Sequence, residues 1–223
     1  MNRRELAIAI VATLAATRAG VTYAKEPPAE WDGLVRRPSK RFKYVYILPG
    51  ADFRPYDSVM LDPAQLAFEK DWQKDYNGRT MGQRITDRDI EDAIARATPR
   101  ATEVFTDAFV TGGYKIATAP GPNVLRITPG VTNIRVSGPD VMRAGRSRTY
   151  AGEAGSATLI VEARDSVTDA LLGRVADSRV AGDNSIMMMR NSATNRADFT
   201  YLAKRWAKGL VEGLNELRRQ APA

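Results

Sequence analysis

The chain has 223 residues and a formal net charge of +7 at pH 7, and it contains neither cysteine nor histidine. Its length allows one domain with a substantial core, and its 43% hydrophobic and 26% charged residues are typical of a globular protein. The two missing residue types exclude disulfides, the usual zinc sites and the Ser-His-Asp and Cys-His catalytic arrangements. We therefore assign no catalytic, cofactor-binding or metal-binding residue, and the sequence favours a non-enzymatic protein.

The N-terminus has the pattern of a secretory signal peptide. Arg3 and Arg4 form a basic start, and the apolar run Leu6–Ala16 is much shorter than the ~20 residues of a transmembrane helix. An amphipathic helix would carry charge on one face, which this run does not. We expect a signal peptide over residues 1–24, cleaved after Ala24, and a periplasmic or secreted mature protein with no transmembrane span and no lipid anchor through cysteine.

Residues 25–42 are expected to form an extended polar and basic lead-in to the domain. They begin with a proline-rich stretch and end in the basic cluster Arg36–Lys43. This cluster could touch an anionic lipid or an acidic polymer, but a flexible approach to the first strand is the simpler interpretation. Elsewhere lysines and arginines alternate with acids, so we expect no nucleic-acid partner.

Five segments upstream of the central hairpin are predicted to be strands because aromatic and β-branched residues are frequent in them. The apolar residues fall on odd positions in Val124–Thr128 and on even positions in Val131–Val136. We therefore expect a bulge or break at Pro129-Gly130 that restores a common buried face. The other segments predicted as strands are Tyr44–Leu48, Asp57–Leu61 and Tyr114–Thr118.

An amphipathic helix is predicted over Thr86–Phe109, where apolar residues recur at helical spacing. Thr86 and Asp89 resemble a capping box, with Asp in place of the usual Glu or Gln. Pro99 either kinks one long helix or follows a Thr98 cap as the first residue of a second helix.

The segment Ala157–Val180 is the clearest hairpin of the sequence. A three-residue loop at Val167–Asp169 fixes the register of its arms, and Asp169 is expected in the left-handed conformation. One face then gains an apolar pair and the other an oppositely charged pair. These pairs are Val161 with Val175 and Glu162 with Arg174.

A final amphipathic helix is predicted over Thr194–Leu217, with Trp206 in its apolar stripe as a core residue. Residues 43–223 are thus expected to form a single α+β domain. We predict two layers: a largely antiparallel or mixed sheet, with two main helices packed on one face.

Three groups of residues together resemble a bacterial family catalogued as domain of unknown function 3313. The resemblance implies an exported, envelope-associated protein of unassigned activity, often a lipoprotein. The chain departs from this pattern in lacking a lipid-accepting cysteine and in carrying Asp169 where a Thr-Gly turn is usual. The residues that carry the resemblance are Tyr46–Phe53 with Tyr56 and Val59–Pro63, then Pro120–Arg126, and Asp165–Leu172.

Two hypotheses of function follow from the sequence. The first is a non-enzymatic envelope module that contacts an envelope protein or cell-wall partner through Met187, Met188 and Met189, within a loop expected over Ala181–Asn195. Three adjacent thioethers without histidine are a poor Cu(I) site, so no metal is assigned to them. The alternative is a carboxylate-dependent hydrolase of envelope polysaccharide. Its candidate acids are Asp52, Asp57, Asp62 and Glu162.

Overall fold

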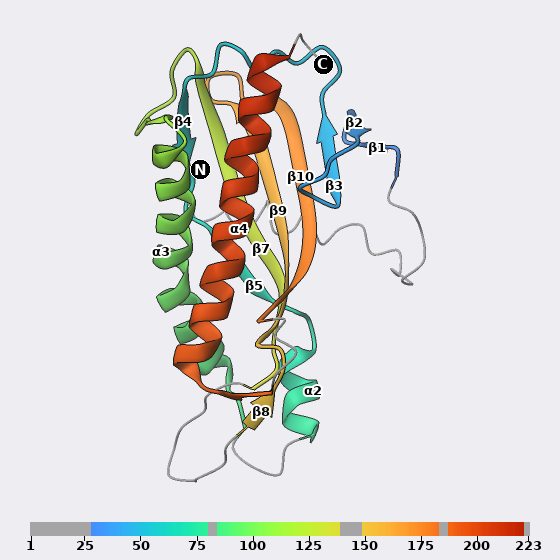
Figure 1. Cartoon of the computed structure of the whole chain (residues 1–223), viewed down its shortest axis with the longest axis vertical. Helices are drawn as coiled ribbons and strands as arrows, with labels where there is room; N and C mark the ends of the chain where they lie inside the picture. The colour runs from blue at the N-terminus through green and yellow to red at the C-terminus, as the bar shows by residue number, and fades with distance from the viewer. Residues whose placement is uncertain (1–27, 80–83, 139–148, 183–186, 221–223) are drawn as a thin grey trace.

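Two long helices cover one face of a nine-stranded mixed sheet in the residues that the computed structural model describes, 28–79, 84–138, 149–182 and 187–220 (Figure 1). The architecture confirms the predicted α+β class. The expected signal peptide, residues 1–24, lies outside the described residues. The helices are α2 (Trp72–Arg79), α3 (Asp87–Thr111) and α4 (Ser192–Arg219). The strands are β1 (Glu30–Trp31), β2 (Leu34–Arg37), β3 (Tyr44–Ile47), β4 (Ser58–Leu61), β5 (Gln65–Phe68), β6 (Lys115–Ile116), β7 (Val124–Val136), β8 (Thr149–Ala151), β9 (Gly155–Asp165), β10 (Leu171–Ala181) and β11 (Met188–Arg190).

The sheet order is β1-β2-β3-β10-β9-β7-β4-β6, and β5 also pairs with β7 beyond the end of β4. The pairs that involve β4, β5 and β6 are parallel, whereas the rest of the sheet is antiparallel. Strands β8 and β11 form a separate two-stranded ribbon. The sheet is therefore mixed, with its parallel part at the end that α3 covers.

The expected lead-in, residues 25–42, contributes two strands to the sheet from Glu30 onward. Asp32 and Gly33 both have positive φ, which makes a tight two-residue turn between β1 and β2. Leu34 is fully buried, and Trp31 packs edge-on against Tyr46 of β3 at 5.6 Å between ring centroids. The basic cluster thus begins inside a strand rather than in a flexible approach.

Strand β7 runs through Pro129-Gly130 without the predicted break. Asp62 N–H donates to Ile127 O on the β4 side, and β5 pairing begins at Gly130, so Pro129 lies where the partner changes. The pairing with β9 shifts register only beyond Thr132, where Asn133 has φ 49°. The expected change of face therefore occurs, but at Asn133, which tolerates the left-handed conformation.

The central hairpin has the predicted register. Val161 lies opposite Val175 and Glu162 opposite Arg174, and Asp169 has φ 59°. The loop is longer than expected, because the strands end at Asp165 and resume at Leu171, with a further register shift before Gly173.

The two long helices also agree with the sequence. Thr86 caps α3 through a capping box with Asp89, and α3 continues through Pro99 as one helix. Helix α4 buries the predicted stripe, with Trp206 2% exposed and its indole N–H donating to buried Asp177 of β10 at 2.8 Å. This hydrogen bond fixes the middle of α4 on the sheet.

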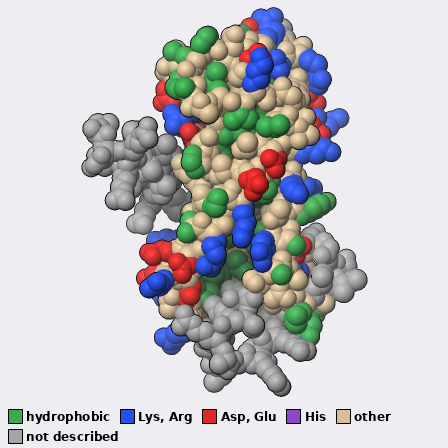
Figure 2. Space-filling view, turned by 90° about the vertical axis from the view of Figure 1, so that its left-hand side faces the viewer, with side chains coloured by type: hydrophobic (Ala, Val, Ile, Leu, Met, Phe, Trp, Pro, Cys, Tyr) green, Lys and Arg blue, Asp and Glu red, His purple; other side chains and the backbone are tan. Residues whose placement is uncertain are grey.

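The outer surface has no dominant sign of charge on the side that carries α3. Figure 2 shows basic and acidic side chains interspersed there with small apolar patches. Among the described residues, none of the helices is both long and apolar enough to cross a bilayer.

Candidate functional site

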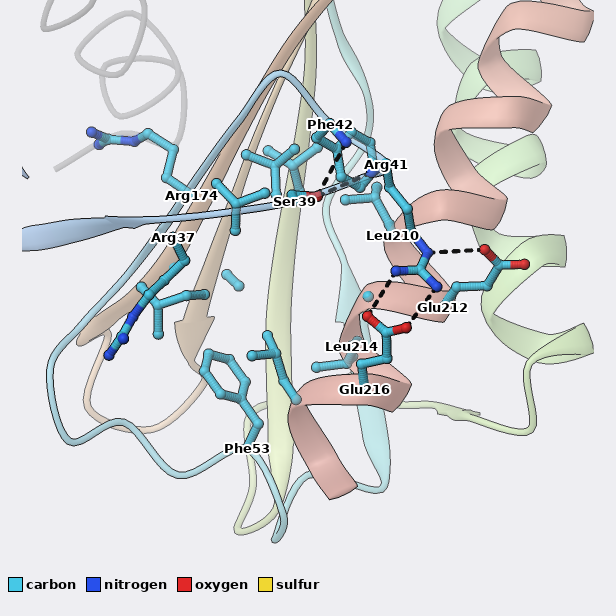
Figure 3. Close-up of a pocket in the computed structure, with 18 of the residues that line it drawn as sticks. Arg37, Ser39, Arg41, Phe42, Phe53, Arg174, Leu210, Glu212, Leu214 and Glu216 are labelled. Carbon is cyan, nitrogen blue, oxygen red and sulfur yellow. Dashed lines mark hydrogen bonds and ion pairs between the residues drawn. The ribbon is translucent and has the colours of Figure 1, made fainter. Parts of the chain in front are cut away.

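An apolar cavity of about 940 Å³ lies between the helix-covered face of the sheet and the C-terminal half of α4 (Figure 3). Four strands supply its floor, because alternate residues of each strand point toward the helices. Helix α4 supplies one wall, and the connection between β2 and β3 supplies the rim. The apolar lining includes Val45, Ile47, Phe53, Leu125, Ile127, Val161, Ala163, Val175, Leu210, Leu214 and Leu217.

Two glycines on one side of α4 shape the cavity. The Phe42 ring packs against Gly209, where an added Cβ would lie 3.0 Å from the Cζ atom of Phe42. One helical turn later, a Cβ on Gly213 would meet no atom of the described residues within 4 Å. Phe42 therefore closes the space beside one turn of α4, and the absence of a side chain at Gly213 leaves the next turn open to the cavity.

A cluster of ion pairs joins the rim to α4. Arg41 donates to both carboxylate oxygens of Glu216 at 2.7 Å and to Glu212 at 3.0 Å, as Figure 3 shows. The Arg41 side chain is 30% exposed and each glutamate 44% exposed, so the cluster lies at the water boundary. The hydrogen bonds from Arg41 lower the pKa of Glu216, with further lowering by Arg219 and Lys40.

The basic cluster found in the sequence is divided between the two faces of the sheet. Arg37, Lys40 and Arg41 line the cavity. Arg36 and Lys43 instead lie over the ring of Tyr44, at 5.2 and 5.4 Å from its centroid. Sequence reasoning identified this cluster but not the cavity beside it.

The segments that carry the family resemblance meet near the same end of the sheet. Tyr56 donates its hydroxyl hydrogen to Asp165 at 2.8 Å, and Ser166 Oγ both accepts from and donates to the backbone of Gly121. The same segments contribute Ile47, Phe53 and Leu125 to the cavity lining. They thus form one wall of the cavity and the hydrogen bonds that hold that wall together.

A family model described as "Protein of unknown function (DUF3313)" matches residues 28–210. The chain belongs to the DUF3313 family. The match begins just before β1 and extends into α4, so it includes the sheet and most of the cavity. No curated protein matches the chain.

Several solved structures resemble this DUF3313 chain at low identity. One is the PelC dodecamer from Paraburkholderia phytofirmans, with 11% identity, coverage of 74% of this chain and 96% of that one, and a TM-score of 0.37. A DUF330 protein from Xanthomonas campestris has 12% identity, coverage of 77% and 89%, and a TM-score of 0.38. A Helicobacter pylori protein described as a neuraminyllactose-binding hemagglutinin homolog has 11% identity, coverage of 76% and 86%, and a TM-score of 0.32. Similarity at this level says nothing of function.

The four acids of the hydrolase hypothesis do not line the cavity. Asp52 is held by Arg54, whose hydrogen bonds lower the pKa of the Asp52 carboxyl to about 2. Asp57 lies just before β4, with its carboxylate bonded to the hydroxyl of Ser58. The structure does bring Asp62 and Glu162 to one face of the sheet, the face opposite the helices, but it places both beside arginines.

A network of charged side chains covers part of that opposite face. Arg174 is only 7% exposed, donates to Asp32 at 2.7 Å and to Glu162 at 2.6 Å, and stacks over the Trp31 ring at 4.2 Å. Arg164 also donates to Glu162, at 2.9 Å. The carboxylate of Glu162 thus joins two arginines across the hairpin, which indicates a structural role for it.

The methionines singled out in the sequence are not among the residues that line the cavity. The expected loop contains strand β11, in which Met189 lies opposite Tyr150 of β8. Met187 is 67% exposed, Met189 42% and Tyr150 52%. The backbone of Met188 belongs to the same strand. Contact with an envelope protein or cell-wall partner through these methionines stays a prediction.

Proposed function

We propose that this chain is an exported, non-enzymatic binding module whose ligand inserts an apolar part into the cavity beneath α4. The observation that carries the proposal is the cavity itself. Its volume of about 940 Å³ lies within the range of ~300–1,000 Å³ found for small-molecule sites. Its lining is mostly apolar, and most of the charged groups lie at the rim, which is the usual arrangement of such sites.

The cavity is an apolar hollow that opens to solvent at its rim, in contrast with the closely packed core around it. Protein interiors are packed as densely as organic crystals, and voids larger than a water molecule are few. A side chain on Gly213 would have room to project beside the cavity, yet the chain has a glycine there, in the interior of a helix where glycine costs ~1 kcal/mol relative to alanine. The absence of a side chain at Gly213 leaves room beside the cavity that a ligand can occupy.

The proposal is tested with Nile red, an uncharged dye whose fluorescence rises in apolar surroundings. Purified mature protein is expected to bind the dye saturably. Gly213→Leu should weaken binding at least about tenfold, because a leucine side chain at this position occupies space that is open in the structure. Gly78→Leu is the matched control, since Gly78 also lies in a helix and no atom of the part of the chain that the structure describes comes within 4 Å of an added Cβ.

Two results would overturn the proposal. One is the absence of saturable binding to the native protein. The other is equal binding by Gly213→Leu and Gly78→Leu, with circular dichroism showing that both variants are folded.

A further inference from the structure

Positive charge exceeds negative charge at the rim of the cavity. The two acids there, Glu212 and Glu216, are both bound by Arg41. Further cations are near them: Lys208 pairs with Glu212 at 3.8 Å, and Lys40 and Arg219 lower the pKa of Glu216. Within the described part of the chain, the two rim acids are thus outnumbered by the cations around them. The cations that line the cavity at its rim are Arg37, Lys40 and Arg41.

Two of these cations are available to a ligand. Arg37 and Lys40 line the cavity and are exposed, and the described residues offer Arg37 no ion pair. Arg41 differs, because two carboxylates already accept its hydrogen bonds. Arg37 therefore presents an unpaired charge beside an apolar space, and Lys40 adds a second exposed cation whose charge Glu216 offsets in part.

Helix α4 places a partial negative charge near the same opening. The C-terminus of a helix repels anions through its unpaired carbonyl groups. Arg218 and Arg219 lie in the last turn of α4 and offset this effect. The rim consequently keeps its positive character up to the end of the helix.

We infer that the ligand is an anionic amphiphile, with its apolar tail in the cavity and its negatively charged head bound by Arg37 and Lys40 at the rim. This inference rests on the proposed function. The head stays at the water boundary because burial of an unpaired charge is far more costly than burial of a tail. Guanidinium and ammonium groups form charge-assisted hydrogen bonds with carboxylate and phosphate oxygens alike.

The test compares three single-chain probes that share a dodecyl tail: dodecanoate, dodecyl phosphate and dodecyltrimethylammonium. Each displaces Nile red from the native protein, below its critical micelle concentration and at low salt. Both anions are expected to bind about tenfold more tightly than the cation, and the difference should shrink at high salt as screening increases. Tighter binding of dodecanoate would point to a fatty-acid-like ligand, and tighter binding of dodecyl phosphate to a phospholipid-like one.

A double variant identifies the residues responsible. Arg37→Gln with Lys40→Gln is expected to abolish the preference for anions while Nile red still binds. Arg88→Gln with Arg96→Gln removes the same charge from the exposed surface of α3 and should leave the preference intact.

The two proposals fail in different ways. Absence of Nile red binding to the native protein overturns the proposed function. Saturable Nile red binding with equal displacement by anions and cation overturns this inference alone, as does an anion preference that survives in the Arg37 and Lys40 variant.

Discussion

Replacing Gly213 by alanine should stabilise the protein, because the space beside this residue is open. Among the residues that the structure describes, a Cβ at this position has no neighbour within 4 Å, so the substitution adds no clash with them. The gain is that of glycine to alanine in a helix interior, about 1 kcal/mol. For a domain of this size that corresponds to a rise in Tm of about 2–4 °C. Urea unfolding followed by tryptophan fluorescence measures the change, with an unchanged m-value as the check on two-state behaviour.

Gly209→Ala is the matched comparison, since it lies in the same helix exactly where the neighbouring space is filled. Its Cβ would approach the Phe42 ring to 3.0 Å, so the ring has to move. Overpacking of this kind costs about 1–3 kcal/mol, which cancels or exceeds the helix gain. The two variants should therefore differ by about 1–3 kcal/mol. Equal effects, or a destabilised Gly213→Ala, would refute an open cavity beside this turn of α4.

Three further predictions concern the opposite face of the sheet, the hairpin turn and the leader. Arg174→Ala should lower the free energy of unfolding by about 2–3 kcal/mol, because it removes one partner of a largely buried ion pair with Glu162. Arg174→Lys should lower the free energy of unfolding by less, and equal losses for the two variants in urea unfolding would contradict a role for the charge. The backbone N–H of Thr168 is the main cause of the lowered pKa of Asp165, so the stabilisation from this carboxylate is complete above about pH 4 and is lost as the pH falls through the lowered pKa. The difference in free energy of unfolding between the native protein and Asp165→Asn should therefore become smaller in acid. A difference that stays constant from neutral pH to about pH 2 would exclude a link between the protonation of Asp165 and stability. Mass spectrometry of protein exported from a bacterial host should find Lys25 at the N-terminus, whereas an intact leader on the exported protein would contradict the signal peptide.

Local patterns predicted the parts of the fold that neighbouring residues determine. The capping box of Thr86 and Asp89, the stripe around Trp206 and the register of the Val161–Val175 pair depend on residues close in the chain, and all three are confirmed. The position of the β7 bulge was wrong. Proline and glycine predict an interruption of the strand, but the change of partner strands accommodates Pro129, and Asn133 supplies the left-handed residue.

The missed elements depend on distant partners. Strand β5 pairs in parallel with β7, and the whole of α3 lies between these two strands in the sequence. The four residues of β5 are only partly buried. The β1–β2 hairpin did have a local signal, the Asp32-Gly33 turn, but its short strands lie between proline-rich and basic stretches that suggested a lead-in. The cavity could not be predicted, because it depends on how α4 lies over four strands. Only Gly209 and Gly213, one turn apart in an amphipathic helix, hinted at it.

The placement of β3 beside β10 has a consequence for how the chain folds. Strand β3 is made early in synthesis, and its partner β10 is made much later, after β7 and β9. The meander β7-β9-β10 can form from contacts between consecutive strands of the sheet. The N-terminal strands can join it only later, because the entropic cost of closing the long loop between β3 and β10 comes before the stabilisation from their pairing. Until β10 appears, β3 has β2 beside it but lacks the larger sheet that its other edge joins. In a chain that emerges N-terminus first, the apolar side chains of Tyr44–Ile47 would therefore wait longer for that sheet than those of the strands made later.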